Sequence, residues 1–179
     1  MADWEHVLDA LARERGGALV RYAALLTGGT AEAEDLVQEA LVRAFSQGRP
    51  LRETAAAEAY VRRAILTVFL DGYRRRERWR GVRHLLVREE ALEGPERSST
   101  DRMDVHAALA TLRPRLRACV VLRFYDDLTV PEIARHLGLS DGTVKRYLSD
   151  GIDALERVLG PLPDTRTRET TLLDTRSTR

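Results

Sequence analysis

The amino-acid sequence predicts an all-α fold, made of two small helical domains joined by a flexible linker. Apolar residues recur every three or four positions in residues 4–15, 19–26, 33–45 and 57–73, a spacing typical of amphipathic helices. The same spacing resumes at Met103, after a break that lacks it. No stretch alternates apolar and polar residues convincingly enough to predict a sheet. Hydrophobic residues make up 44% of the chain and charged residues 32%, which indicates a globular protein.

The stretch 33–45 is strongly amphipathic and belongs to the first predicted domain, residues 1–88. Its apolar side consists of Leu36, Val37, Ala40, Leu41, Ala44 and Phe45. The other side carries an acidic and polar stripe, formed by Asp35, Gln38, Glu39 and Val42. An acidic stripe on a helix is usually just a solvated surface, so this pattern alone does not indicate a function.

An excess of arginine marks the end of the first domain. Residues 62–83 hold eight arginines against two acidic residues, a local net charge of +6, with Phe69, Tyr73 and Trp79 among them. Arginines hold phosphates and aromatic rings stack on unpaired bases, so this composition favours a site for single-stranded nucleic acid. The alternative is a solvated basic helix end, with Phe69 in the core.

The break and the last residues define the other boundaries. Residues 89–102 are acidic, contain glycine, proline and serine, and lack an apolar stripe, which predicts a flexible linker. Helical spacing then runs from Met103 to Phe124, and the second predicted domain spans residues 103–160. Residues 161–179 are rich in threonine and arginine and contain two prolines, so we expect a disordered tail.

Residues 128–155, LTVPEIARHLGLSDGTVKRYLSDGIDAL, are the most informative part of the chain. Thr129 stands three residues before Glu132, the pattern of a capping box, and Ser140 can cap a second helix after a short turn. In that helix one face is apolar, with Val144, Leu148, Ile152 and Leu155. The residues roughly opposite are Thr143, Arg146, Ser149 and Asp150. An apolar back with a small polar and basic front suits the major groove of DNA, so we interpret the segment as a helix-turn-helix rather than an ordinary helical hairpin.

Other classes of protein are disfavoured. The four histidines, at positions 6, 84, 106 and 136, have no histidine or cysteine neighbours at metal-ligand spacing, and no glycine-rich phosphate loop occurs. We therefore expect no catalytic site, metal or cofactor. The single cysteine, Cys119, lies in an apolar run and is expected to be a buried packing residue. Without a signal-peptide pattern or an apolar run of about 18 residues, we expect a cytoplasmic protein that makes no membrane contact of its own.

Three segments resemble, in the right order, a bacterial sigma factor of the extracytoplasmic-function type, the small two-domain class of the sigma-70 superfamily. Region 2 of that family carries a segment like DAEDLVQEAFLRAW, which here reads EAEDLVQEALVRAF. A segment like WLYRIARNLAIDLLRRR follows, and residues 60–76 read YVRRAILTVFLDGYRRR. Region 4 carries LPxRxRxxxxLRxxxxLSxxEIAxxLGxSxGTVKSxL, and residues 112–148 read LRPRLRACVVLRFYDDLTVPEIARHLGLSDGTVKRYL. The resemblance covers roughly residues 1–160, and YVRRAIL is similar to an actinobacterial branch.

The resemblance implies that the chain binds core RNA polymerase and directs promoter-specific transcription initiation. The polymerase clamp helices would contact the acidic stripe, Asp35, Gln38, Glu39 and Val42. The arginine and aromatic segment would open and hold the −10 element, through Tyr60, Arg63, Thr67, Asp71, Tyr73, Arg74, Arg75, Arg76 and Trp79. The second helix of region 4 would read the −35 element, through Thr143, Lys145, Arg146 and Ser149. An anti-sigma factor that covers faces of both domains is a further expected partner.

The sequence departs from the family pattern at four positions. Thr67 stands where an asparagine usually helps form the pocket for a flipped base, and Tyr60 stands where tryptophan is common. Asp150 and Gly151 replace an arginine or histidine and an alanine. Asp150 would repel phosphate, and glycine costs a helix about 1 kcal/mol relative to alanine. We therefore expect the recognition helix to fray after Ser149.

Two other functions are consistent with parts of the sequence. One is a stand-alone helix-turn-helix regulator, in which residues 1–90 form a sensing or dimerising domain; this leaves the DLVQEA segment and the arginine-rich segment unexplained. The other is a helical interaction protein that binds no DNA, which Arg146 and the basic segment disfavour. Gel filtration with core RNA polymerase and with duplex DNA distinguishes the three.

Overall fold

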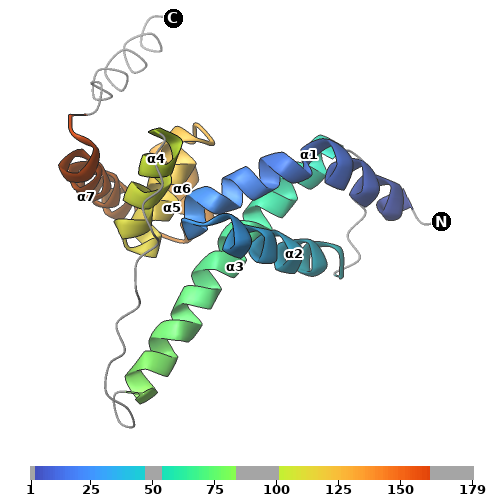
Figure 1. The fold of residues 1–179 in the computed structure, drawn as a ribbon, viewed down its shortest axis with the longest axis horizontal. Helices are drawn as coiled ribbons and strands as arrows, with labels where there is room; N and C mark the ends of the chain where they lie inside the picture. The colour runs from blue at the N-terminus through green and yellow to red at the C-terminus, as the bar shows by residue number, and fades with distance from the viewer. Residues whose placement is uncertain (1–2, 47–53, 84–100, 162–179) are drawn as a thin grey trace, which may run out of the picture.

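The computed structural model describes residues 3–46, 54–83 and 101–161, and in these ranges the regular elements are seven helices and no strands (Figure 1). The all-α prediction is confirmed. Predictions that fall on residues 84–100 and 162–179, which include most of the expected linker and tail, lie outside the described residues. The second helical group begins at Asp101, so the last two residues assigned to the linker are helical.

Three helices form the first group: α1 (Asp3–Thr27), α2 (Thr30–Ser46) and α3 (Thr54–Arg83). Each packs against the other two, around a core that includes Leu11, Leu19, Tyr22, Leu36, Val61 and Ile65. The two stretches predicted at 4–15 and 19–26 are one continuous helix, because the glycines between them do not interrupt α1. The C-terminal half of α3 projects from the body of the molecule (Figure 1).

Four helices form the second group: α4 (Asp101–Thr111), α5 (Pro114–Phe124), α6 (Val130–Leu137) and α7 (Asp141–Leu159). The helical spacing from 103 to 124 is divided in two by Pro114. Proline disfavours helical backbone in the residue before it, and Arg113 accordingly has an extended ψ of 141°. α5 then packs against α6 and α7, with Cys119 fully buried as expected.

The predicted helix-turn-helix is confirmed, and its caps are those read from the sequence. Thr129 and Glu132 form a capping box at the start of α6, and Gly138 ends that helix with a positive φ of 63°. Ser140 accepts a hydrogen bond from the backbone N–H of Thr143 at the start of α7. The polar backbone groups at the starts of α6 and α7 therefore find hydrogen-bond partners a few positions away in the chain.

The expected fraying of the recognition helix is wrong. α7 continues to Leu159, and Gly151 is buried inside it. A Cβ atom at this position would lie 2.8 Å from Cγ2 of Val120 in α5. The glycine is thus explained by the close approach of α5 to α7, and the packing outweighs its lower helix propensity.

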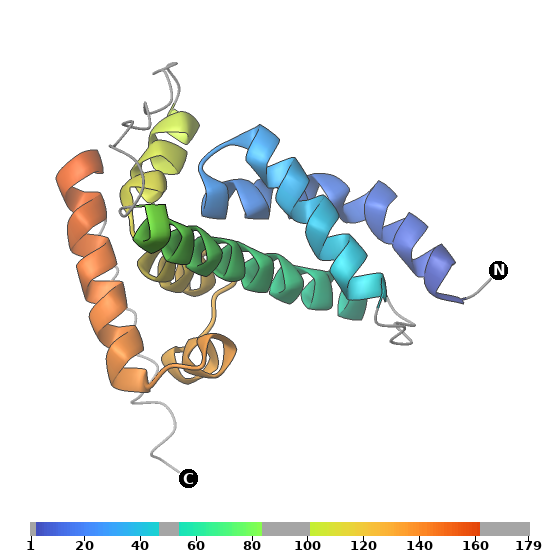
Figure 2. The same ribbon diagram turned by 90° about the horizontal axis from the view of Figure 1, so that it is seen from below.

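The two helical groups also pack against each other, an arrangement that the sequence analysis did not predict. α1 contacts α4 and α5, and α3 contacts α5. Seen from below, α3 lies between α2 and α7 (Figure 2). Ala108, Leu109, Leu112 and the buried residues of α5 thereby join one continuous hydrophobic cluster with the core of the first group.

Candidate nucleic-acid interface

The predicted acidic stripe lies on the exposed side of α2. Asp35, Gln38, Glu39 and Val42 are all exposed, whereas the opposite side of the helix packs into the core. Val42, which lies among these polar side chains, is 70% exposed. Acidic residues around an exposed apolar residue form a surface suited to a basic protein partner.

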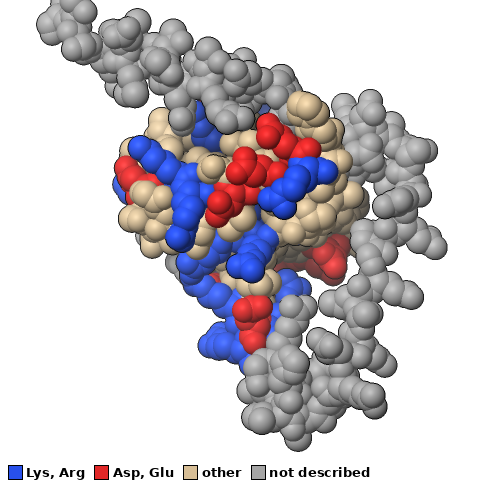
Figure 3. Space-filling model, turned by 90° about the vertical axis from the view of Figure 1, so that its left-hand side faces the viewer, with Lys and Arg blue, Asp and Glu red and all other residues tan. Residues whose placement is uncertain are grey.

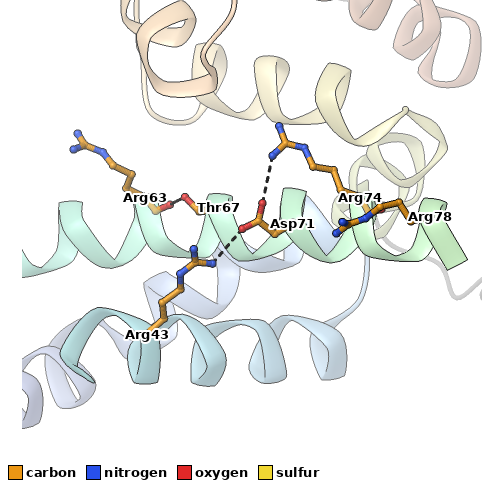
Figure 4. Close-up of polar contacts among 6 residues, drawn as sticks. All are labelled: Arg43, Arg63, Thr67, Asp71, Arg74 and Arg78. Carbon is orange, nitrogen blue, oxygen red and sulfur yellow. Dashed lines mark hydrogen bonds and ion pairs between the residues drawn. The ribbon is translucent and has the colours of Figure 1, made fainter. Parts of the chain in front are cut away.

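A row of polar side chains follows one side of α3 (Figure 4). The row consists of Arg63, Thr67, Asp71, Arg74 and Arg78, at helical spacing. Asp71 holds two cations: its Oδ2 accepts from Nη1 of Arg43 at 3.2 Å, and its Oδ1 accepts from Nη1 of Arg74 at 3.4 Å. Asp71 therefore connects α2 to α3 and orients two arginines at the surface.

Thr67 lies at the middle of this row with its side chain exposed. Its Oγ1 donates a hydrogen bond to the backbone carbonyl of Arg63 at 2.8 Å. The hydroxyl proton is thus occupied, and the oxygen lone pairs remain able to accept. An asparagine amide would offer two donors here, so the Thr67 departure changes the hydrogen-bonding character of this position.

The aromatic residues of α3 have different environments. Phe69 is 6% exposed and lies in the core, which is the alternative that the sequence left open for this residue. Tyr73 donates from its hydroxyl to Glu77 Oε1 at 2.9 Å, and Tyr60 is half-buried. Trp79 belongs to α3, but its side chain lies outside the described residues. Arg75 and Arg76 are exposed, as expected of phosphate-binding residues.

The front of α7 carries the residues predicted to read DNA. Lys145, Arg146 and Ser149 are exposed, and the Arg146 guanidinium lies 5.6 Å from the centre of the Tyr147 ring. Thr143 is half-buried, and its hydroxyl bonds to that of Ser140 at 2.9 Å. Three of the four predicted residues can therefore reach a ligand directly, while Thr143 also serves the helix cap.

A cleft of about 1560 Å³ brings the three predicted surfaces together. It is lined from α2, α3, the start of α5 and α7, and includes Glu39, Asp71, Tyr73, Arg74 and Arg146. The arginines that line it are Arg43, Arg74, Arg75, Arg78, Arg113, Arg115, Arg146 and Arg157. The acidic residues are Glu39, Asp71, Glu77 and Asp150. Basic side chains extend from the body of the molecule onto the projecting helix (Figure 3).

Several of these arginines could not be assigned to a site from the sequence. No local signal in the sequence distinguishes them from solvated charges. They are Arg43, Arg78, Arg113, Arg115 and Arg157. They become part of a basic cleft only because α5 packs against α3 and α7 packs against α5. In the described ranges, no group of three or more potential metal ligands occurs, and no helix is long and apolar enough to cross a membrane.

The comparisons with known proteins agree with this geometry. The family model for sigma-70 region 2 matches residues 11–80, and the model for sigma-70 region 4 matches residues 102–155. The chain therefore belongs to the sigma-70 family. Its relatives place it among sigma factors of the extracytoplasmic-function type, which direct promoter-specific transcription initiation.

Two curated relatives and one solved structure illustrate the similarity. The ECF RNA polymerase sigma factor SigL of Mycobacterium tuberculosis is 33% identical over 165 residues, covering 89% of this chain and 93% of the relative. The RNA polymerase sigma-E factor of Streptomyces coelicolor is 33% identical over 154 residues, covering 82% of each. The sigma factor RpoE of Bartonella quintana, solved in complex with the anti-sigma factor NepR, is 25% identical with a TM-score of 0.56, covering 80% of this chain and 90% of that one.

Proposed function

We propose that the sigma-factor activity of this chain is divided among the three helical surfaces described above. The observation that carries the proposal is the agreement between the family models and the helical groups. The region 2 match falls on α1, α2 and α3, and the region 4 match falls on α4 to α7. We accordingly assign residues 1–88 to region 2 and residues 101–160, which begin with α4, to region 4.

In this proposal, core RNA polymerase binds the outer face of α2. Asp35, Gln38, Glu39 and Val42 are exposed together, and the rest of the helix is fixed by its buried apolar side. The carboxylates would orient a basic partner by charge complementarity. The exposed Val42 side chain would be buried on binding, which is favourable because its apolar surface is removed from water. Charge reversal on this face would oppose the same partner.

The −10 element is held by α3. Arg63, Arg74, Arg75 and Arg76 offer cations to phosphates, and Tyr60, Tyr73 and Trp79 offer rings to unpaired bases. Thr67 and Asp71 lie between them on the helix. Because the Thr67 hydroxyl proton is bound to the backbone, this position accepts hydrogen bonds from a base rather than donating them.

The −35 element is read as duplex by α7, through Thr143, Lys145, Arg146 and Ser149. Arginine can form two hydrogen bonds to one guanine in the major groove, and Arg146 is exposed on the front of the helix. The helix remains intact beyond Ser149, so Asp150 also faces the DNA side and weakens phosphate binding there.

We also propose that an anti-sigma factor restrains this chain, as the complex of the Bartonella quintana relative with NepR suggests. The chain acts in the cytoplasm, where RNA polymerase is found, and opens promoters by binding rather than by catalysis of its own. No metal or cofactor enters the proposal.

The test is assembly with core RNA polymerase. Reversal of Asp35→Arg together with Glu39→Arg should abolish co-elution with the core enzyme while preserving the helical circular dichroism signal. The matched control is Glu14→Arg with Asp153→Arg, which changes the net charge equally at exposed positions on α1 and α7. If the α2 variant still co-elutes, the polymerase contact lies elsewhere.

A further inference from the structure

The arginine-lined cleft carries more positive charge than the proposed contacts with polymerase and DNA account for. Its volume is about 1560 Å³, and eight arginines line it against four acidic residues. The eight arginine side chains are all exposed, and they come from α2, α3, α7 and the start of α5. Three of them, Arg113, Arg115 and Arg157, have no part in the contacts proposed above. Their place in the cleft therefore needs a separate explanation.

Few of these cations are neutralised by neighbouring carboxylates. Asp71 pairs with Arg43 at 3.2 Å and with Arg74 at 3.4 Å. The other six arginines of the cleft form no ion pair within 4.0 Å with any residue that the structure describes. Like charges held close together repel one another, and the walls of a cleft strengthen the field inside it. An anion placed among these side chains is therefore attracted.

The start of α5 adds backbone donors to the same cleft. Arg113 is the N-cap residue of α5, and its side chain makes no capping hydrogen bond. Pro114 has no N–H, so the first backbone donors of the helix are those of Arg115 and Leu116, which also line the cleft. A helix N-terminus carries partial positive charge and binds phosphate through such N–H groups. It supplements the arginines and does not define the site by itself.

The chemistry of the cleft suits phosphate. All of its cationic side chains are arginines, and a guanidinium forms two parallel hydrogen bonds with phosphate. A phosphate group carries more negative charge and more acceptor oxygens than a carboxylate. The Tyr147 ring also lines the cleft, but the Arg146 guanidinium already lies 5.6 Å from its centre. Recognition through phosphates is therefore favoured over stacking of a base.

The size of the cleft indicates a ligand with more than one phosphate. Pockets for small molecules typically enclose about 300–1,000 Å³, which is less than the volume of this cleft. Arg75 of α3, Arg115 of α5 and Arg157 of α7 lie on three separate helices. A chain of phosphates places successive charges along the cleft and contacts arginines of several helices at once.

We propose that this cleft binds a soluble oligophosphate, either an inorganic chain or the polyphosphate group of a nucleotide. Arg113, Arg115 and Arg157 supply contacts from region 4, and Arg75 and Arg78 supply contacts from region 2. Recognition is through the phosphates, so the two sources of ligand bind in the same way. The site itself does not depend on which residues bind promoter DNA.

One consequence of the site does depend on the proposed function. Arg74, Arg75 and Arg146 line the cleft and are also assigned above to promoter DNA. A bound oligophosphate would compete with the phosphates of DNA for the same guanidinium groups. The ligand would therefore lower the affinity of the chain for DNA.

The test is isothermal titration calorimetry on the full-length chain, with sodium tripolyphosphate, GTP and orthophosphate as probes. Tripolyphosphate and GTP should each bind saturably, one per chain, with affinities within about tenfold of each other, because both present three linked phosphates. Orthophosphate should bind at least about tenfold more weakly, because it reaches fewer guanidinium groups.

Variants of the cleft locate the binding. Arg113→Gln with Arg115→Gln should weaken tripolyphosphate binding at least about tenfold, because two charge-assisted contacts are lost. Arg157→Gln on α7 should also weaken it, which guards against an effect of the first pair on the folding of α5. The matched control is Arg21→Gln with Arg135→Gln, an equal change of charge at exposed positions outside the cleft. Helical circular dichroism should be the same for all variants.

Three results would overturn the proposal. Equal weakening by the cleft and control variants would mean that binding follows net charge. Binding of GTP without binding of tripolyphosphate would mean that the base is recognised. Equally tight binding of a short polyglutamate peptide would mean that the cleft does not select phosphate.

Displacement of a labelled −35 duplex from the free chain by tripolyphosphate tests the consequence for DNA. If tripolyphosphate binds in the cleft and the duplex is not displaced, the oligophosphate site is supported and the assignment of Arg146 to DNA is contradicted. Failure of the site and failure of the proposed function are therefore distinguished.

Discussion

Gly151 of α7 packs directly against Val120 of α5, so closely that a Cβ atom on the glycine would lie 2.8 Å from the valine Cγ2. The two helices that carry these residues form the main packing of region 4. A glycine within a helix is normally replaceable by alanine with a gain of about 1 kcal/mol. At Gly151 an added Cβ atom would clash with the Cγ2 methyl group of Val120, so we expect no such gain from alanine.

We predict that Gly151→Ala destabilises the chain by about 1 kcal/mol, because overpacking outweighs the gain in helix propensity. Chemical denaturation measures the change. In a Val120→Ala background the same substitution should be neutral or stabilising. Gly142→Ala is the matched control in the same helix, since a Cβ atom there meets nothing within 4 Å. A destabilising effect of equal size at both glycines would contradict the packing explanation.

The two promoter contacts should differ in salt dependence. We predict that Arg75→Ala weakens holoenzyme binding to all promoters alike, because a phosphate contact carries no sequence information directly. The slope of log affinity against log salt should decrease in magnitude by about 0.7 to 0.9, for one lost contact. Filter binding or fluorescence anisotropy over a salt series measures it. An effect confined to one promoter sequence would argue against a phosphate contact.

Arg146→Ala should instead reduce discrimination among −35 sequences. A bidentate contact to guanine provides about 1–3 kcal/mol of discrimination against a wrong base. The difference in binding free energy between good and poor −35 elements should shrink by that amount, with −10 preference unchanged. The measurement uses paired promoters that differ only in the −35 element. If Arg146→Ala and Arg75→Ala gave the same profile, the assignment of α7 to duplex readout would be wrong.

Asp150→Arg should strengthen −35 binding. The structure shows that α7 is intact at this position and that Asp150 is exposed one turn after Arg146. Replacing a repulsive carboxylate by a cation adds a phosphate contact, and the salt slope should steepen by about 0.9 for duplex DNA. Glu14→Arg on α1 has the same charge change and serves as the control. Equal gains from both variants would indicate a general charge effect.

The sequence predicts region 4 well because its signals are local. The capping box of Thr129 and Glu132 and the cap of Ser140 each join residues three positions apart, and both occur as expected. The surface of α2 also follows from the spacing of its apolar residues. The packing of region 4 on region 2 could not be predicted, because it depends on contacts between residues far apart in the chain. One of them is the hydrogen bond from Arg62 to Asp126, which are 64 positions apart. An arginine on a helix has the same local pattern whether it binds solvent, DNA or a distant aspartate, and Phe69 likewise suits a core or a stacking surface.

The contact between the two helical groups has a predicted pH dependence through His136. We call the chain closed when the groups are packed together and open when they are separated. Nη2 of Arg63 contacts Nε2 of His136. Because a guanidinium only donates hydrogen bonds, this contact requires a neutral His136 imidazole whose Nε2 accepts. Burial lowers the pKa of His136 from its usual value, and the cations of Arg63 on α3 and Arg135 on α6 lower it further. The carboxylates of Asp126 and Glu132 oppose this effect only in part.

A histidine pKa that is lower in the closed form means that the open form binds more protons. The stability of the closed form is therefore complete above the usual histidine pKa of about 6.5 and is lost as the pH falls below it. Burial raises the pKa of Asp126, which favours closure in acid, but a carboxyl group starts from about 3.9 and titrates in a more acidic range.

We predict that the radius of gyration of the free chain increases between pH 7.5 and pH 5.5, as His136 becomes protonated beside Arg63 and the two groups separate. Small-angle X-ray scattering at constant ionic strength measures the change. His136→Gln, which cannot be protonated, should remain closed over the same range. His6→Gln is the control, because His6 is exposed on α1 and away from the contact. A pH response that persists in His136→Gln would place the titrating group elsewhere in the interface.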